Sequence, residues 1–483
     1  MKRTDIIQKL NLEQKCALLS GETVFTTRAL PGKGIPAITL SDGPNGVRKQ
    51  AGAADHLGLN PSVPATCFPT SSATACSWDE KLGEAVGEAL GEEAAAQEVA
   101  VLLGPGLNIQ RSPLCGRDFE YFSEDPILAG RMAAAYVRGI QKNGISACPK
   151  HFAVNSQELR RMASDSVLDE RTLRELYLTG FEIVVKEAKP KTIMTSYNLI
   201  NGTYANENAH LLQDILRKDW GFDGAVVTDW GGSNDHALGV KNGSTLEMPC
   251  PGGDSIRELM KAVQDGKISE ADVDARLDEM LELVLSTHAA VEKAPRTFDA
   301  AAHHKLARRA AAESIVLLRN EGGILPLKPN EMLAVIGDFA ETPRYQGAGS
   351  SAVNALQVDT LLDCIKADDS GITFVGYASG FERQGAADAE KLEEAVALAK
   401  KADTVLLCLG LDELRESEGI DRADMKLAEN QQQLLAAVAA VNPNVVVLLS
   451  AGAPVPTPWV ALGNSTSLQG TWCFSSARLS AGR

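Results

Sequence analysis

One aspartate ends an apolar segment of the chain. The stretch 224–232 reads GAVVTDWGG, so Asp229 follows a short run of Ala, Val and Thr and precedes Trp230. Strands often stop at Asp and Gly because both residues favour turns. The alternative is that the carboxylate lies at the open end of a buried sheet, where α/β folds carry out their chemistry.

Other apolar segments of the first half also end on polar side chains. They are AITLS, ISACPKH and TIMTSY, together with the polar run that follows the segment 100–106. The polar residues concerned are Asp42, Arg117, Lys150, His151 and Tyr197. In a parallel α/β barrel all these positions face one end, where the loops converge on a shared pocket.

Each residue also has a simpler interpretation. Asp42 in DGPNG is typical of a turn, and Arg117 with Glu120 could form a surface ion pair. Lys150 could form a Schiff base, as in barrel aldolases, or donate hydrogen bonds to hydroxyl groups. Tyr197 could be an interface tyrosine with a packed ring. The agreement among several strand ends is therefore a better signal than any one residue.

A second carboxyl is available in the other half of the chain. The charged stretch LGLDELRESEGIDRADM, at 409–425, follows an apolar segment and contains Glu416 and Glu418. Such a stretch is usually a solvated loop, but a long loop can also reach the pocket of a neighbouring domain. Hydrolysis of a glycosidic bond requires two carboxyl groups, and this loop could supply the partner of Asp229.

The elements that would position these residues alternate between short β-rich and helical segments. In the first 250 residues, helical patterns such as 81–98 and 171–188 separate the apolar runs, which predicts βαβ units and a mainly parallel sheet. A barrel and a doubly wound sheet both fit. After a polar passage near 292–304, a second alternation predicts strands buried on both faces. Its expected strands are 314–320, 332–340, 372–378, 404–411 and 444–454.

Composition excludes several classes of partner. The 483 residues carry a formal net charge of −16 with scattered acidic residues, which argues against nucleic acid and anionic membranes. The N-terminus lacks the uninterrupted apolar core of a signal peptide, and no apolar run could span a membrane. Nine widely spaced cysteines are typical of buried thiols in a reducing cytoplasm. No motif suggests a metal, a phosphate loop or another cofactor.

Seven segments occur in a characteristic order along the chain: SDGPNGVR, RSPLCGRDFEYFSEDP, CPKHFAVNSQELRRM, MTSYNLINGTYANEN, GFDGAVVTDWGG, SIVLLRNEGGILPL and ESEGIDR. Taken together and in this order, they resemble the family 3 glycoside hydrolases, specifically their β-glucosidase branch. The resemblance runs from about residue 5 to Trp459 and implies a TIM-barrel-like N-terminal domain followed by an α/β sandwich domain. The active site would lie between the two domains.

The resemblance also implies roles for individual residues. Asp229 would be the nucleophile of a retaining, exo-acting enzyme that releases terminal nonreducing β-D-glucose, and Glu418 the acid/base, with Glu416 in reserve. Seven residues match positions that hold the terminal sugar: Asp42, Arg117, Lys150, His151, Arg161, Tyr197 and Trp230. We expect a cationic donor to keep the pKa of Asp229 low, and a less cationic loop to leave Glu418 protonated.

Other activities, within and outside this family, are alternatives to a β-glucosidase. KHFAVNSQE departs from the KHFPGHG pattern of the family's β-N-acetylglucosaminidases. A β-xylosidase of the same family differs by as little as one contact at the sugar's C6 group. A carbohydrate-binding relic without turnover and a Lys150 aldolase are the remaining alternatives. We expect a β-glucoside or oligosaccharide substrate and no nucleic acid or membrane partner, and we also consider a homodimer.

The expected domain boundaries follow from these patterns. We predict a catalytic domain at 1–295, a linker at 296–305 and an incomplete sandwich domain at 306–459. Residues 460–483 are rich in Ser and Gly and are expected to form an atypical tail, as in a truncated or frame-shifted product. On this expectation, folding of the second domain and closure of the active site depend on the part of the sandwich that is present.

Overall fold

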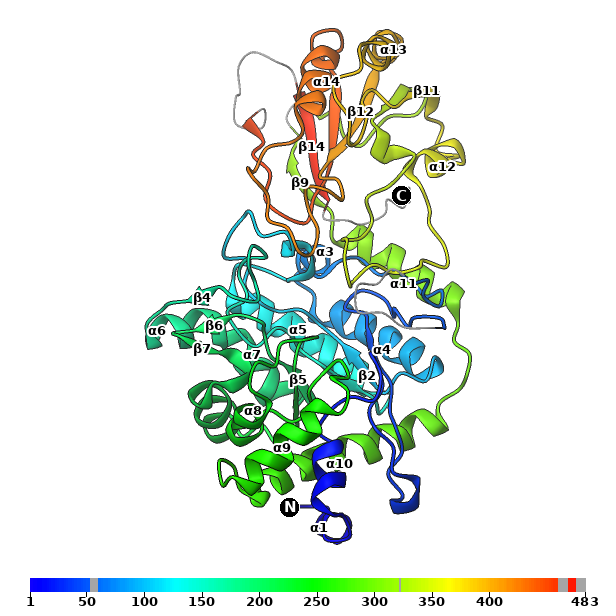
Figure 1. Ribbon diagram of the computed structural model, residues 1–483. Coiled ribbons are helices and arrows are strands. Elements are labelled where there is room, and N and C mark those ends of the chain that lie inside the picture. Colours follow the sequence, from blue (N-terminus) through cyan, green and yellow to red (C-terminus); the bar gives the residue numbers. More distant parts are fainter. Residues whose placement is uncertain (53–59, 321–322, 459–467, 475–483) are drawn as a thin grey trace.

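The computed structural model describes residues 1–52, 60–320, 323–458 and 468–474. The chain forms an N-terminal barrel domain and a C-terminal sheet domain that follow one another along the long axis of the molecule (Figure 1). Each domain has its own hydrophobic core. The two cores and their order confirm the expected fold class, a TIM-barrel-like domain followed by an α/β sandwich.

The barrel is built from short parallel strands. Their bounds are β1 (Leu40–Asp42), β2 (Val101–Leu103), β3 (Ser146–Ala147), β5 (Thr192–Met194) and β8 (Ala225–Val227). β1, β2 and β3 pair in parallel, and so do β5 and β8. Single bridges continue the ring and return it to β1: Phe152 with Thr195, Val227 with Leu246, Ser20 with Glu247, Gly21 with Thr27, and Thr26 with Thr39.

An irregular N-terminal segment therefore completes the ring where a regular strand would be expected. The run at 244–249 contributes only bridges, at Leu246 and Glu247. A separate small sheet, which the sequence did not predict, lies outside the ring. It consists of β4 (Asp165–Ser166), β6 (Leu199–Ile200) and β7 (Thr203–Tyr204).

Helices surround the barrel, and local sequence signals fix where two long covering helices begin. Asp79 caps α4 (Glu80–Ala96) through the backbone N–H of Lys81, and Asp125 caps α5 (Pro126–Gln141). Gly87 allows these helices to approach closely, because a Cβ atom there would collide with the backbone of Tyr136. Further α-helices of this domain are α1 (Thr4–Ile7), α2 (Leu12–Ala17), α3 (Ser71–Ala75), α6 (Glu170–Thr172), α7 (Thr179–Ile183), α8 (His236–Asn242), α9 (Asp254–Gln264) and α10 (Glu270–Lys293).

The second domain contains one six-stranded sheet in the order β11-β10-β12-β13-β14-β9. All neighbouring pairs are parallel except β14 with β9. The strands are β9 (Val316–Arg319), β10 (Met332–Ile336), β11 (Thr373–Ala378), β12 (Thr404–Gly410), β13 (Val445–Ser450) and β14 (Leu468–Phe474). β9 was predicted to be buried on both faces. It lies at the sheet edge instead, and Leu317 and Leu318 are exposed.

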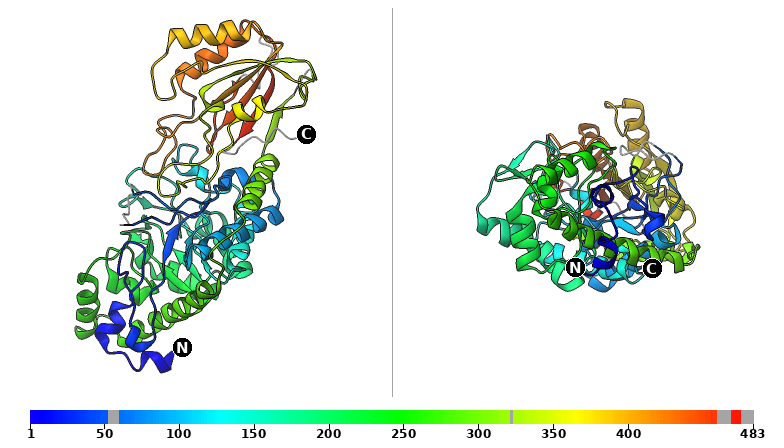
Figure 2. Two further views of the ribbon diagram at one scale, coloured as in Figure 1. Left: turned by 90° about the vertical axis from the view of Figure 1, so that its right-hand side faces the viewer. Right: turned by 60° about the horizontal axis from the view of Figure 1, so that its bottom comes forward.

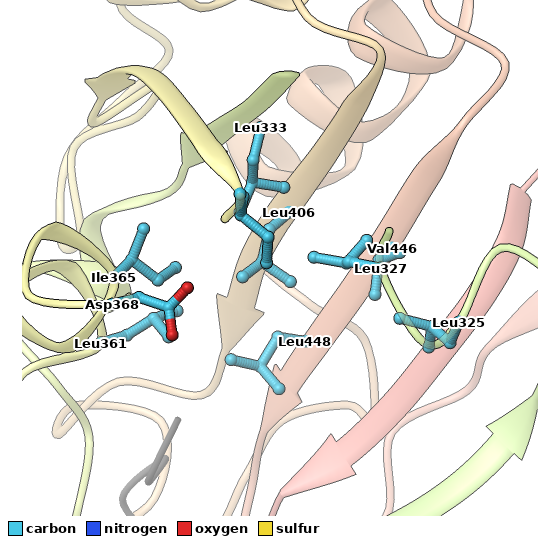
Figure 3. Close-up of a pocket in the computed structure, with 10 residues that line it drawn as sticks. Leu325, Leu327, Leu333, Leu361, Ile365, Asp368, Leu406, Val446 and Leu448 are labelled. Atoms are coloured by element: carbon cyan, nitrogen blue, oxygen red, sulfur yellow. The ribbon is translucent and has the colours of Figure 1, made fainter. Parts of the chain in front are cut away.

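The helices of this domain lie on both faces of the sheet (Figure 2). They are α12 (Leu361–Lys366), α13 (Ala389–Ala399) and α14 (Glu429–Ala439). On the α12 face, β10, β12 and β13 turn Leu333, Leu406 and Leu448 toward an apolar cavity of about 200 Å³ (Figure 3). Apart from Asp368, side chains without polar groups line this cavity. It therefore offers a hydroxyl group only the carboxylate of Asp368 among its lining side chains.

Two expected boundaries are corrected by the structure. The predicted linker at 296–305 overlaps helix α11 (Ala300–Glu313), whose Ala307 and Ala310 are buried in the core of the barrel domain. The predicted tail overlaps β14, which pairs in parallel with β13, so the sheet continues beyond residue 459. Thr, Trp and Phe in that segment favour strands, and the Ser-rich composition around them obscured this signal. The rest of the predicted tail lies outside the described residues.

Two further sequence expectations concern membranes and cysteines. Within the described residues, no helix is both long enough and apolar enough to span a bilayer. Cys16, Cys115, Cys148 and Cys408 are buried as expected, whereas Cys76 is exposed.

Candidate active site

The polar strand ends of the barrel converge on one cavity of about 410 Å³. Asp42 is the last residue of β1, and Lys150 and His151 follow β3. Tyr197 follows β5, and Asp229 follows β8 by two residues. Because the carboxyl ends of parallel strands meet at one end of a barrel, residues far apart in the sequence come together here.

Asp229 is buried, lines this cavity and has one carboxylate oxygen without a hydrogen bond. Its Oδ1 accepts a hydrogen bond of 2.8 Å from the backbone N–H of Trp230. Its Oδ2 lies 3.6 Å from Nε2 of His151 and has no hydrogen-bond partner among the described residues. Buried polar atoms nearly always have a partner, so an unpartnered carboxylate oxygen on a residue that lines a cavity makes Asp229 a candidate functional residue.

His151 is held as a neutral ring beside Asp229. Burial, and then the positive charges of Arg117, Lys150 and Arg161, lower the pKa of His151 well below its usual value. Nδ1 of the ring lies 3.2 Å from the Tyr121 hydroxyl. Asn108 holds the backbone of His151 through two hydrogen bonds, one to its N–H and one to its carbonyl oxygen. The ring can therefore exchange hydrogen bonds with a hydroxyl group without adding charge.

A fully buried ion cluster fixes the two cations at the base of the cavity. Nε and Nη2 of Arg117 donate to Oε2 of Glu120 at 2.8 and 2.7 Å. The Lys150 ammonium lies 3.2 Å from Oε1 of Glu120 and 4.0 Å from the Asp42 carboxylate. The sequence left open a surface ion pair between Arg117 and Glu120. The structure buries both side chains, each with 1% exposure.

Replacing Glu120 by Gln should therefore destabilise the protein strongly. Two buried cations would lose their shared carboxylate, and breaking a buried pair costs about 3–5 kcal/mol of unfolding free energy. Denaturant unfolding measures this loss. Glu187→Gln is the matched control, because Glu187 forms an exposed pair with Arg131 and exposed pairs contribute no more than about 1 kcal/mol. Equal stability of the two variants would contradict the buried cluster.

The second domain contributes one carboxyl group to the same cavity. Glu418 lies on the loop after β12, and its Oε1 accepts from Nη1 of Arg161 at 2.8 Å. Nη1 of Arg117 lies 3.7 Å from the same oxygen. Oε2 accepts from the backbone N–H of Ser350 at 2.8 Å. The cavity is thus completed by residues from both domains.

The electrostatics of the two carboxyls are the reverse of the sequence expectation. Burial raises the pKa of Asp229 above its usual value, although Arg117, Lys150 and Arg161 oppose the shift. For Glu418, burial also acts to raise the pKa, but Arg117, Arg161 and hydrogen bonds from Ser350 outweigh it and lower the pKa. The expectation was wrong because the sequence did not show that two arginines of the barrel contact the Glu418 loop.

Asp42 is a third carboxyl with a shifted pKa. Burial raises its pKa to about 6, against the stabilising charge of Lys150. Near neutral pH, the ionised group is an acceptor for hydroxyl groups.

Aromatic residues form one wall of the cavity. The Trp230 ring packs against Phe25 with centroids 5.3 Å apart, and its Nε1–H donates to the carbonyl of Val24. The Tyr197 hydroxyl donates to the carbonyl of Trp230 at 3.0 Å. The Arg161 guanidinium lies 4.9 Å from the Tyr197 ring centroid. This wall offers an apolar face to a ring-shaped ligand.

All nine residues that the resemblance singled out line this one cavity, and their roles remain predictions. The reserve residue Glu416 does not line it, because its buried carboxylate accepts from the backbone N–H of Gly452. Sequence reasoning missed Phe25, Met162, Met194, Gly231, Pro249 and Ser350. Phe25 and Ser350 lie outside regular strands, so no periodicity marked them.

Among the described residues, no group of His, Cys, Asp and Glu is arranged to hold a metal ion.

Several known proteins are similar to this chain in sequence and in fold. A 45% identical relative over 458 residues is the thermostable beta-glucosidase B of Acetivibrio thermocellus, and the match covers 94% of this chain. An exo-alpha-(1->6)-L-arabinopyranosidase of Bifidobacterium breve is 44% identical over 478 residues, or 96% of this chain. The chain spans 60% and 62% of the length of these two relatives.

A solved structure is similar over nearly the whole chain. The GH3 beta-glucosidase of Bifidobacterium adolescentis superposes with a TM-score of 0.91 at 41% identity, covering 99% of this chain and 68% of that one. The Glycosyl hydrolase family 3 N terminal domain matches residues 49–283, and the Glycosyl hydrolase family 3 C-terminal domain matches residues 315–477. The chain therefore belongs to glycosyl hydrolase family 3.

Proposed function

We propose that this chain is a retaining, exo-acting glycoside hydrolase that releases terminal nonreducing β-D-glucose through a covalent intermediate on Asp229. The observation that carries the proposal is the buried, unpartnered Oδ2 of Asp229 in a cavity that also contains Glu418. A retaining mechanism requires such a pair, one carboxylate to attack and one carboxyl to protonate. The family membership supports the same reaction class.

In the first step, Asp229 attacks the anomeric carbon of the sugar. The bond from that carbon to the leaving oxygen breaks, and the leaving oxygen takes the proton of Glu418. In the second step, Glu418 removes a proton from water, the water oxygen bonds to the anomeric carbon, and the ester to Asp229 breaks. Arg117, Lys150 and Asp42 line the same cavity, and in this proposal they bind the sugar hydroxyls during both steps.

Sugar binding also has to change the state of Glu418. In the structure its carboxylate is paired with Arg161, which favours the ionised form. A general acid must carry a proton. We propose that sugar hydroxyls draw Arg161 away from Glu418, so that the pKa of Glu418 rises as the substrate enters the cavity.

A panel of aryl glycosides tests the substrate class on the purified chain. We expect the highest kcat/KM for the β-D-glucoside, with lower values for the β-D-xyloside, β-D-galactoside and β-N-acetylglucosaminide. Sugar binding in calorimetry without turnover of any activated glycoside would instead favour a carbohydrate-binding relic. Borohydride trapping on Lys150 would favour the aldolase alternative.

A second candidate substrate is an α-L-arabinopyranoside. The Bifidobacterium breve relative, named for this activity, is 44% identical to this chain. Like the xyloside, this sugar is a pentopyranose without a C6 group, so the aryl α-L-arabinopyranoside belongs in the panel. A higher kcat/KM for the aryl α-L-arabinopyranoside than for the β-D-glucoside would make the arabinopyranoside the preferred substrate. The proposed roles of Asp229 and Glu418 would not change.

A further inference from the structure

Asp421 connects the Glu418 loop to the barrel domain. It lies three residues after Glu418, and its carboxylate accepts hydrogen bonds from backbone N–H groups of two barrel loops. Oδ1 accepts from Glu158 at 2.9 Å and from Gly116 at 3.2 Å. Oδ2 accepts from Leu159 at 2.8 Å and from Glu158 at 3.1 Å. One side chain thus satisfies three backbone donors across the domain boundary.

The same short loop makes further contacts with the barrel. The backbone N–H of Gly419 donates to Oε2 of Glu158 at 2.8 Å, and the N–H of Arg422 donates to the carbonyl of Leu114 at 2.8 Å. Glu158 also pairs with Arg161, the residue that contacts Glu418. The loop therefore contacts the barrel at Gly419, Asp421 and Arg422, directly after Glu418, and Asp421 forms the largest number of these hydrogen bonds.

Gly116 shows how closely the loop lies against the barrel. A Cβ atom at this position would collide with the carbonyl oxygens of Ile420 and Ser417. The backbone of the loop is therefore packed directly on the backbone of the barrel. If the hydrogen bonds to Asp421 are lost, we expect the loop to shift on the barrel. The distance between Glu418 and the sugar site then changes with it.

We propose that Asp421 is a positioning residue that sets the place of the Glu418 carboxyl. This inference rests on the proposed function, in which Glu418 is the acid. A carboxylate is suited to the task because both oxygens only accept, and hydrogen bonds to an ionised acceptor are strong. Asn at 421 would turn an NH₂ group toward one set of backbone donors, and Ala would remove every acceptor.

The kinetic test compares Asp421→Ala and Asp421→Asn with the unchanged protein. kcat/KM is measured for a dinitrophenyl β-glucoside, whose leaving group needs no proton, and for an alkyl β-glucoside, whose leaving group does. Because misplacing a catalytic group by about 1 Å costs up to about 10²-fold, we expect the alkyl substrate to lose about tenfold more than the dinitrophenyl substrate. Asp424→Asn is the matched control, since Asp424 is exposed on the same loop and its Oδ1 accepts only from the N–H of Lys426.

Hydrogen exchange gives a second readout that does not depend on turnover. The amides of Gly116, Glu158 and Leu159 should exchange faster in both Asp421 variants, and the Asp424 variant should match the unchanged protein. Equal losses for the two substrates, or unchanged exchange at these amides, would overturn the positioning role. If the unchanged protein hydrolyses neither substrate, the proposed function fails. The exchange result still decides whether Asp421 anchors the loop.

Discussion

Replacing Asp229 by Gly should lower kcat for an aryl β-glucoside by at least about 10⁴-fold, because the variant has no group that can form the glycosyl ester. The unpartnered Oδ2 of Asp229 is the atom that is lost. The substitution leaves the buried cluster of Arg117, Glu120 and Lys150 intact, so sugar binding in calorimetry should persist. Steady-state kinetics with calorimetry on the same preparation separates chemistry from binding.

Added azide should sharpen this result. It can enter the space of the missing carboxylate, attack the anomeric carbon from that face and give the α-glucosyl azide from the β-glucoside. Detection of that product would place Asp229 on the attacking face. Retention of near-normal hydrolysis by the Gly variant would exclude Asp229 as nucleophile.

Replacing Glu418 by Gln should produce a loss that depends on the leaving group. General acid catalysis contributes about 10²–10⁴-fold, so kcat/KM for an alkyl β-glucoside should fall by this factor. A dinitrophenyl β-glucoside needs no acid and should keep most of its kcat/KM. The Gln side chain retains an acceptor for the backbone N–H of Ser350, which limits the structural disturbance.

The second step gives a further test of Glu418 that distinguishes it from Asp229. Without a general base, the glycosyl-enzyme should react slowly with water, and azide should release it as the β-glucosyl azide because azide needs no deprotonation. The opposite anomers expected from the two variants assign the two carboxyls to opposite faces of the sugar. A uniform loss for both leaving groups, without azide rescue, would show that Glu418 is not the acid.

The barrel part of the candidate site could be predicted because its polar residues lie at the ends of apolar runs that the sequence pattern identifies as strands. A polar residue at the end of an apolar run, as at Asp229 and Tyr197, marks a strand end, and parallel strand ends converge. The contribution of the second domain could not be predicted in this way. The charged stretch at 409–425 could be recognised as a source of a second carboxyl, but only the resemblance favoured Glu418 over Glu416, since a charged loop carries no signal of where it docks.

The pKa shifts of the two carboxyls, the contacts between the domains and the closure of the barrel could not be predicted from the sequence for a related reason. The pKa values of Asp229 and Glu418 depend on whether Arg161 reaches across the domain boundary, which is a tertiary contact. The bonds from three backbone amides to Asp421 are equally invisible, because backbone donors have no sequence identity. The N-terminal segment that closes the barrel at Thr26 and Thr39 lacks strand periodicity. The sequence therefore did not predict that Phe25 lines the cavity.

The most direct test of the account is covalent trapping of the glycosyl-enzyme. An activated 2-deoxy-2-fluoro-β-glucoside forms the ester quickly and hydrolyses slowly, because fluorine destabilises the oxocarbenium-like transition state of both steps while the good leaving group restores the first. Peptide mass spectrometry should find one fluoroglucosyl group on Asp229, in the segment 224–232. A label on any other residue would contradict the proposed mechanism, as would turnover without a label.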